Sequence, residues 1–111
     1  MQDIFELYQY IKDKYHNYQK IEHTETEILI VFHDEFEMKI KIKNYYNFYF
    51  NNIFYYNLDW QDVKEFVDDI FANQYAFCEK GKKLKIISLK DYNVNTSYDY
   101  NHVWTIERTL K

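Results

Sequence analysis

Residues 36–43 alternate strictly between apolar and charged side chains, and this run constrains the fold more than any other part of the chain. The apolar positions are Phe36, Met38, Ile40 and Ile42, and the charged positions are Glu37, Lys39, Lys41 and Lys43. Successive side chains of a strand point to opposite faces of a sheet, so one face of this strand meets a core and the other meets solvent. The run predicts a half-buried strand in a hairpin.

Further strands are predicted on both sides of this run. They cover residues 24–32, two short segments within 44–58, and residues 75–79, 84–90 and 102–110. Tight turns are predicted between several of them. Asn51-Asn52 suits the positive φ angles of a hairpin turn within 44–58, and Gly81, the only glycine in the chain, marks the turn between 75–79 and 84–90. Strands joined by such short turns pair antiparallel.

Two segments have the apolar spacing of an amphipathic helix. Residues 3–19 place on one face Ile4, Leu7, Tyr8, Ile11, Tyr15 and Tyr18, and residues 59–73 do the same with Trp60, Val63, Phe66, Val67, Ile70 and Phe71. Asp3 and Asp59 stand at the N-cap positions, where a carboxylate accepts a hydrogen bond from a backbone N–H of the first turn. We predict a helix in each segment.

These elements predict an α+β fold with a curved antiparallel sheet of about five to seven strands and both helices packed on one face. The predicted order is one helix, three or four strands, a second helix and three strands. The chain has 111 residues, no proline and no linker-like stretch, so we expect a single domain over residues 1–111. The predicted core consists of Ile4, Leu7, Ile11, Ile28, Ile30, Met38, Ile40, Val63, Phe66, Val67, Ile70 and Trp104.

The residues that common active sites need are missing from the sequence. A Walker A loop, a dinucleotide-binding turn and a nucleophile elbow each need at least two glycines, and the chain has one. The four histidines lack zinc-ligand spacing, and Cys78 is the only cysteine, so no intrachain disulfide is possible. We expect no enzymatic activity, no metal and no cofactor. With no signal peptide pattern and no apolar run of bilayer length, we expect a cytoplasmic protein without membrane binding.

Charged and aromatic residues supply the candidate binding site. Asp62, Glu65 and Asp69 fall on one line of the second predicted helix, where their charges add over a compact patch. The neighbouring strands carry the tyrosines Tyr45, Tyr46, Tyr49, Tyr55 and Tyr56, and exposed aromatic rings often anchor protein interfaces. We interpret these eight residues as a candidate partner-binding surface. A small basic tip is predicted at Lys80, Lys82, Lys83, Lys85 and Lys90, for which a solvated surface is the simplest interpretation.

The resulting hypothesis is a non-enzymatic protein-binding module that acts by occupying a partner's surface. An inhibitor, an immunity protein or an anti-defence protein of a phage or mobile element fits this description, with a basic protein as its partner and a homodimer as a compatible state. Two alternatives stay open: single-stranded nucleic-acid binding through a Tyr- and Lys-rich sheet, and a small enzyme without a recognisable motif. Nucleic acid is the less expected ligand, because the chain contains one arginine.

Overall fold

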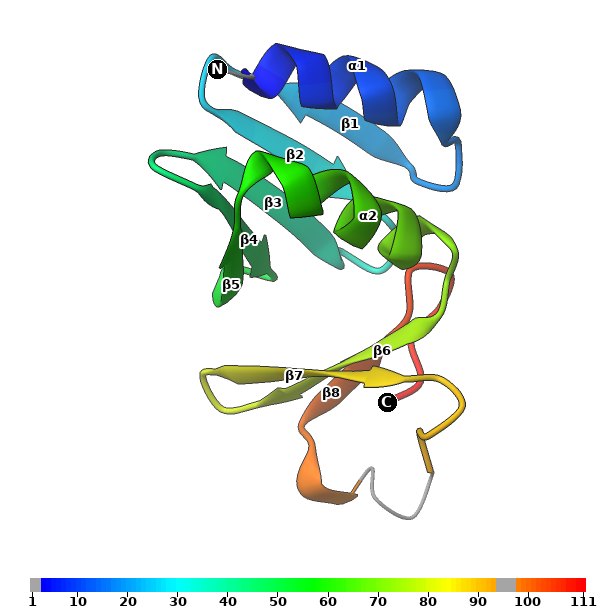
Figure 1. Ribbon diagram of the computed structural model, residues 1–111. Helices are drawn as coiled ribbons and strands as arrows, with labels where there is room; N and C mark the ends of the chain where they lie inside the picture. The colour runs from blue at the N-terminus through cyan, green and yellow to red at the C-terminus, as the bar shows by residue number, and fades with distance from the viewer. Residues whose placement is uncertain (1–2, 94–97) are drawn as a thin grey trace.

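The computed structural model describes residues 3–93 and 98–111, and within them the chain forms two helices and eight strands (Figure 1). The elements are α1 (Ile4–Lys14), β1 (Lys20–His23), β2 (Glu27–Val31), β3 (Glu37–Ile42), β4 (Tyr46–Phe50), β5 (Ile53–Leu58), α2 (Trp60–Phe71), β6 (Tyr75–Lys80), β7 (Lys83–Ser88) and β8 (His102–Trp104). Every strand pair is antiparallel, which confirms the predicted α+β fold class. Neither helix is long and apolar enough to cross a membrane.

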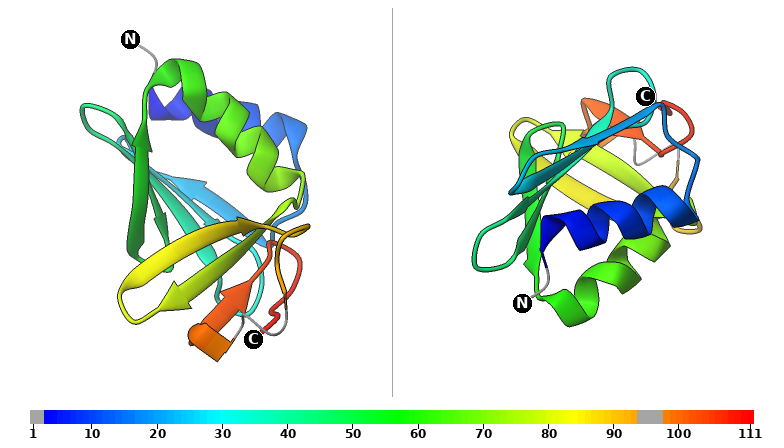
Figure 2. Two further views of the ribbon diagram at one scale, coloured as in Figure 1. Left: turned by 60° about the horizontal axis from the view of Figure 1, so that its bottom comes forward. Right: turned by 90° about the horizontal axis from the view of Figure 1, so that it is seen from above.

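The strands form two sheets. The larger sheet is a meander in the order β1-β2-β3-β4-β5, and the smaller has the order β7-β6-β8. Both helices lie on one face of the larger sheet, as predicted, and the smaller sheet lies at the other end of the molecule from the helices, with β7 close to β5 (Figures 1 and 2). Neither sheet is strongly curled, so the curvature is smaller than the sequence led us to expect.

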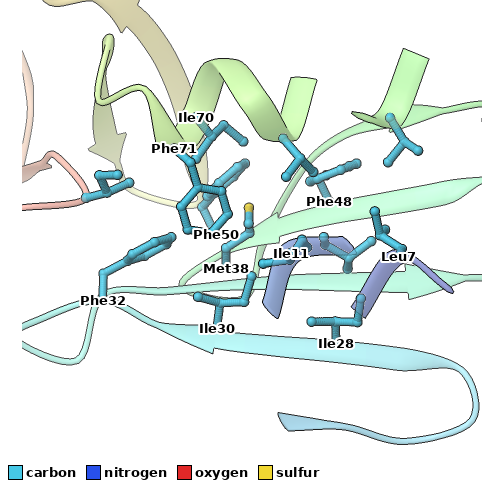
Figure 3. Packing of buried hydrophobic residues seen from close by; sticks show 14 of the residues in the cluster. Leu7, Ile11, Ile28, Ile30, Phe32, Met38, Phe48, Phe50, Ile70 and Phe71 are labelled. Carbon is cyan, nitrogen blue, oxygen red and sulfur yellow. The ribbon is translucent and has the colours of Figure 1, made fainter. Parts of the chain in front are cut away.

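The main core lies between the larger sheet and the two helices (Figure 3). The predicted alternation of residues 36–43 is confirmed, because Phe36, Met38 and Ile40 are fully buried. Eleven of the twelve predicted core residues are buried, and the exception is Phe66, which is half-buried. Phe71, predicted on the apolar face of the second helix, belongs to this core, and further phenylalanines that the sequence analysis did not assign complete it: Phe32, Phe48, Phe50 and Phe77.

Phe36 joins the two sheets. Its ring lies 6.5 Å from that of Phe50 in β4, 5.1 Å from that of Phe77 in β6 and 5.2 Å from that of Trp104 in β8, measured between ring centroids. Ring pairs at these distances stabilise a core beyond the area that they bury. The smaller sheet is therefore packed onto the larger through aromatic contacts, with one continuous core between them.

The first helix ends at Lys14, five residues before the predicted end. Tyr15 is the C-cap in an extended conformation with φ −125°. Its ring stacks on that of Phe71 in α2, with 4.4 Å between the ring centroids. Tyr15 continues the apolar spacing of the helix, but its ring is packed from a position outside the helix. The chain then reverses and adds β1, which the sequence analysis missed, as an edge strand beside β2.

Helical periodicity predicts that Asp68 of α2 faces solvent. In the structure its carboxylate instead forms hydrogen bonds and an ion pair with residues at the end of α1. Its carboxylate accepts hydrogen bonds from the hydroxyls of Tyr10, at 2.8 and 3.0 Å, and of Tyr15, and it pairs with Lys14 at 3.2 Å. Burial opposes ionisation of Asp68, but the hydrogen bonds from Tyr15, Tyr10 and Lys14 outweigh it and hold its pKa below the ordinary value. We call Asp68, Tyr10, Tyr15 and Lys14 the helix clasp.

The predicted turns are confirmed by their backbone angles. Asn51 and Asn52 have φ angles of 49° and 65°, and Gly81 has a φ of 61° between β6 and β7. Asp34 and Glu35, in the turn between β2 and β3, also have positive φ angles of 44° and 64°. Asparagine and aspartate tolerate this region better than most residues, and glycine enters it without strain.

The last strand is shorter than predicted, covering three residues in place of 102–110. Thr105 ends it, because its hydroxyl accepts hydrogen bonds from the backbone N–H groups of Glu107 and Arg108 at 3.2 and 3.1 Å. The chain reverses there, and Thr109 forms a bridge back to Trp104. Residues 91–101 are rich in Tyr and Asn, which predicts a polar loop before this strand, and residues 94–97 lie outside the described part of the chain.

Two hydrogen bonds tie this C-terminal turn to the turn between β2 and β3. Nε2 of His33 donates to the backbone oxygen of Thr105 at 2.7 Å, and the Thr109 hydroxyl donates to Asp34 at 2.8 Å. The Thr109 hydrogen bond, followed by the contact with His33, lowers the pKa of Asp34. The C-terminal turn is thus held against the larger sheet by residues far away in the sequence.

Replacing Asp59 with alanine is expected to lower the free energy of unfolding by about 1 kcal/mol through loss of the N-cap of α2. The Asp59 carboxylate accepts a hydrogen bond from the backbone N–H of Asp62 at 3.3 Å, as the sequence predicts. Urea unfolding monitored by circular dichroism measures the effect. Gln61→Ala, an exposed change in the same turn, is the control, and equal midpoints for the two variants would contradict the assignment.

Candidate functional site

A groove of about 300 Å³ runs between β5 and α2. It is lined by Tyr55, Tyr56 and Leu58 from β5 and by Asp62, Glu65, Phe66 and Asp69 from α2. The two elements are neighbours because a single residue, Asp59, links the end of β5 to the start of α2. The structure thus brings together five of the eight candidate partner-binding residues, and we call this the acidic groove.

A β-bulge places two consecutive tyrosines in the acidic groove. The register between β4 and β5 shifts so that Phe48 pairs with Tyr56 and Tyr49 pairs with Phe54, which leaves Tyr55 as the extra residue. A bulge of this kind re-aims side chains that would otherwise alternate between faces. Both tyrosines can therefore line the same groove.

The aromatic wall has a buried part and an exposed part. The ring of Tyr55 is half-buried and lies nearly parallel to that of Phe66, at an interplanar angle of 11° and a centroid distance of 6.1 Å. Burial raises the pKa of the Tyr55 hydroxyl, and the nearby Tyr56 adds to the effect. Tyr56 is 54% exposed, with its ring 6.1 Å from that of Tyr55. A partner can therefore contact Tyr56 without any change in the core.

The other wall carries three carboxylates. Asp62 and Glu65 are exposed and Asp69 is half-buried, and the seven residue steps from Asp62 to Asp69 span about 10 Å of helix. The only basic residue of α2, Lys64, lies over the rings of Trp60 and Tyr10 at 4.8 and 5.0 Å, and it is not among the lining residues. The lining of the acidic groove therefore combines negative charge with aromatic surface and contains no basic side chain.

Tyr75, the first residue of β6, belongs to the same neighbourhood. Burial raises the pKa of its hydroxyl, and the charge of Asp69 is the next largest cause, with smaller effects from Tyr55 and Glu65. The sequence analysis did not select this residue, because nothing local distinguishes it from the other tyrosines. Only the tertiary fold, which brings Tyr75 close to Asp69 and Tyr55, places it there.

The remaining three candidate residues lie elsewhere. Tyr46 is only 4% exposed and packs 5.5 Å from Trp60 in the core, so the expectation that it offers a binding surface is wrong. Tyr45 is 53% exposed in the connection between β3 and β4. Tyr49 lies on the outer face of the larger sheet, against Phe54 and beneath Lys41. The five candidate tyrosines therefore do not form one continuous surface.

Among residues 3–93 and 98–111, no group of three or more His, Cys, Asp and Glu side chains is arranged to hold a metal ion. Comparisons of the chain with protein families, with curated proteins and with solved structures found no match. The acidic groove is therefore interpreted from its own chemistry.

Proposed function

We propose that the protein is a non-enzymatic binding module that takes a basic segment of another protein into the acidic groove. The observation that supports this proposal is the meeting of Tyr55 and Tyr56 with Asp62, Glu65 and Asp69 in one groove. Carboxylates form charge-assisted hydrogen bonds with lysine and arginine, and the faces of tyrosine rings attract the same cations. The lining thus favours cationic side chains over neutral or acidic ones.

The size of the groove indicates what part of a partner would enter it. About 300 Å³ accommodates a few side chains and not a folded element, so an exposed loop or a chain end with lysine or arginine is the proposed ligand. The carboxylates would speed the encounter by electrostatic steering, and the exposed ring of Tyr56 would supply apolar contact area after docking. By occupying that segment the protein would block its other contacts, as an inhibitor, immunity or anti-defence protein of a phage or mobile element in the cytoplasm does.

The triple variant Asp62→Asn, Glu65→Gln, Asp69→Asn tests the electrostatic part of this proposal. Short oligoarginine and oligolysine peptides serve as defined probes, followed by nuclear magnetic resonance of the backbone amides. We expect the wild-type protein to show shifts centred on residues 55–69, and the triple variant to bind more weakly and with a smaller dependence on salt. The control variant Asp13→Asn, Glu22→Gln, Glu25→Gln removes the same charge from exposed positions elsewhere. Equal losses in both variants would show that only net charge matters and would overturn the proposal.

A pair of tyrosine variants tests the aromatic part. Tyr56 and Tyr45 are equally exposed, at 54% and 53%, but only Tyr56 lines the acidic groove. Tyr56→Ala is expected to weaken peptide binding about tenfold, and Tyr45→Ala to leave it unchanged. Identical affinities for the two variants would remove Tyr56 from the site.

A further inference from the structure

A second groove, of about 520 Å³, lies on the smaller sheet. Its lining residues are Cys78, Lys80, Lys83, Leu84, Lys85 and Tyr100. Three of the six carry positive charge and none is acidic. We call it the lysine groove, and none of its residues belongs to the acidic groove.

The register of β6 and β7 brings the three lysines together. Lys80 pairs directly with Lys83, and Cys78 pairs with Lys85. Residues directly opposite each other in an antiparallel pair lie on the same face of the sheet, and their Cβ atoms are about 5 Å apart. Residues two apart along one strand also lie on the same face, about 7 Å from each other. Lys80, Lys83 and Lys85 therefore stand as a compact triangle on one face of the sheet.

Among residues 3–93 and 98–111, no salt bridge neutralises this triangle. Like charges directly opposite on neighbouring strands are destabilising. The salt bridges of the described residues involve four other lysines and His33, and none reaches Lys80, Lys83 or Lys85. In a chain of net charge −4, this uncompensated cluster points to an anionic ligand.

The walls of the lysine groove are held in place. The backbone N–H of Asn101 donates to the backbone oxygen of Glu79, and the Asn101 side-chain oxygen accepts from the N–H of Gly81, both at 2.8 Å. These bonds fasten the segment that carries Tyr100 to the turn between Lys80 and Lys83. At the floor, burial raises the pKa of the Cys78 thiol to about 11, so the thiol stays neutral at physiological pH and adds no negative charge.

We propose that the lysine groove binds a phosphate monoester or polyphosphate group. Such a group carries a charge of about −2 and three acceptor oxygens at its terminal phosphorus, so one group can accept hydrogen bonds from three ammonium groups. A carboxylate has one charge and two oxygens, and a phosphodiester has one charge, so each matches the compact triangle less well. Lysine ammonium groups bind phosphate as point charges, which suits a site without arginine.

Titration with three probes tests the chemical class of the ligand. They are inorganic tripolyphosphate, a glutamate oligomer and an oligothymidylate without a terminal phosphate, each followed through the amide resonances of residues 80–85 and 100. We expect tripolyphosphate to bind at least about tenfold more tightly than the other two. Equal or tighter binding of the glutamate oligomer would identify an acidic protein segment, and equal or tighter binding of the oligothymidylate would identify a nucleic-acid chain. Either outcome, or no binding of tripolyphosphate, overturns the proposal.

A triple lysine variant tests the location of the site. We expect tripolyphosphate binding to weaken at least about tenfold in the variant Lys80→Gln, Lys83→Gln, Lys85→Gln. The control variant changes three exposed lysines elsewhere, Lys12→Gln, Lys20→Gln and Lys43→Gln, and should weaken binding less than about twofold. The first variant should also unfold at an unchanged or higher temperature, because it removes like-charge repulsion. Equal losses in both variants would mean that binding follows net charge, and the lysine groove would not be the site.

Discussion

Replacing Phe36 with alanine is expected to lower the free energy of unfolding by about 3 to 5 kcal/mol, which is a large part of the stability of an ordinary domain. The side chain is fully buried and contacts aromatic rings of β4, β6 and β8, so its removal leaves a cavity where the two sheets meet. Urea unfolding followed by tryptophan fluorescence measures the change, and Trp104 beside Phe36 reports on the same junction.

Alanine variants of two other phenylalanines serve as comparisons for the loss of stability in Phe36→Ala. Phe54 is 52% exposed, so Phe54→Ala should cost less than about 1 kcal/mol. Phe66 is half-buried between Phe48 and Tyr55, so Phe66→Ala should fall between the two. If Phe36→Ala is no more destabilising than Phe54→Ala, the sheets do not share a core at Phe36.

Replacing Asp68 with alanine is expected to cost about 2 kcal/mol, because it removes the shared acceptor of the helix clasp. Tyr10, Tyr15 and Lys14 would then lose their common partner, while the packing of Tyr15 on Phe71 would remain. The partial exposure of Asp68 keeps the estimate toward the lower end for a charged acceptor. Hydrogen exchange of the amides near Lys14 should accelerate in the variant, whereas exchange near Gly81 should not change.

The contribution of Asp68 is also expected to depend on pH. Its folded-state pKa is depressed, so the stability that it contributes is present above the ordinary aspartate value of 3.8 and is lost as the pH falls through the folded-state pKa. Asp68→Asn mimics the protonated form, so the stabilities of this variant and the wild type should differ at neutral pH and converge in acid. A difference that stays constant down to the lowest pH at which both fold would show that the charge of Asp68 is unimportant. Asp91→Asn, at an exposed position, is the control.

Local signals predicted the second helix better than the first. The start of α2 follows from Asp59, whose side chain caps the helix whatever surrounds it. The end of α1 has no such signal, because Tyr15 and Tyr18 continue the helical spacing while their rings pack against Phe71 from outside the helix. Strand β1 was missed because it is a short edge strand with three exposed residues, and edge strands have little apolar alternation.

The acidic groove was predicted in part. The helical spacing of Asp62, Glu65 and Asp69 placed them on one line, and they do line one groove. The meeting of Tyr55 and Tyr56 in that groove depends on a bulge, for which the sequence has no local signal. The burial of Tyr46, in contrast, follows from its alternation with Phe48 and Phe50, a pattern that was available in the sequence and was not used.

The hydrogen bonds between the C-terminal turn and the β2–β3 turn have a consequence for the order of folding. All four pairings of the larger sheet join strands adjacent in sequence, and closing such short loops has a small entropic cost. The bonds from His33 to Thr105 and from Thr109 to Asp34 span 72 and 75 residues, and contacts of that separation form late. The meander can therefore form first and act as the template on which β8 and the C-terminal turn close.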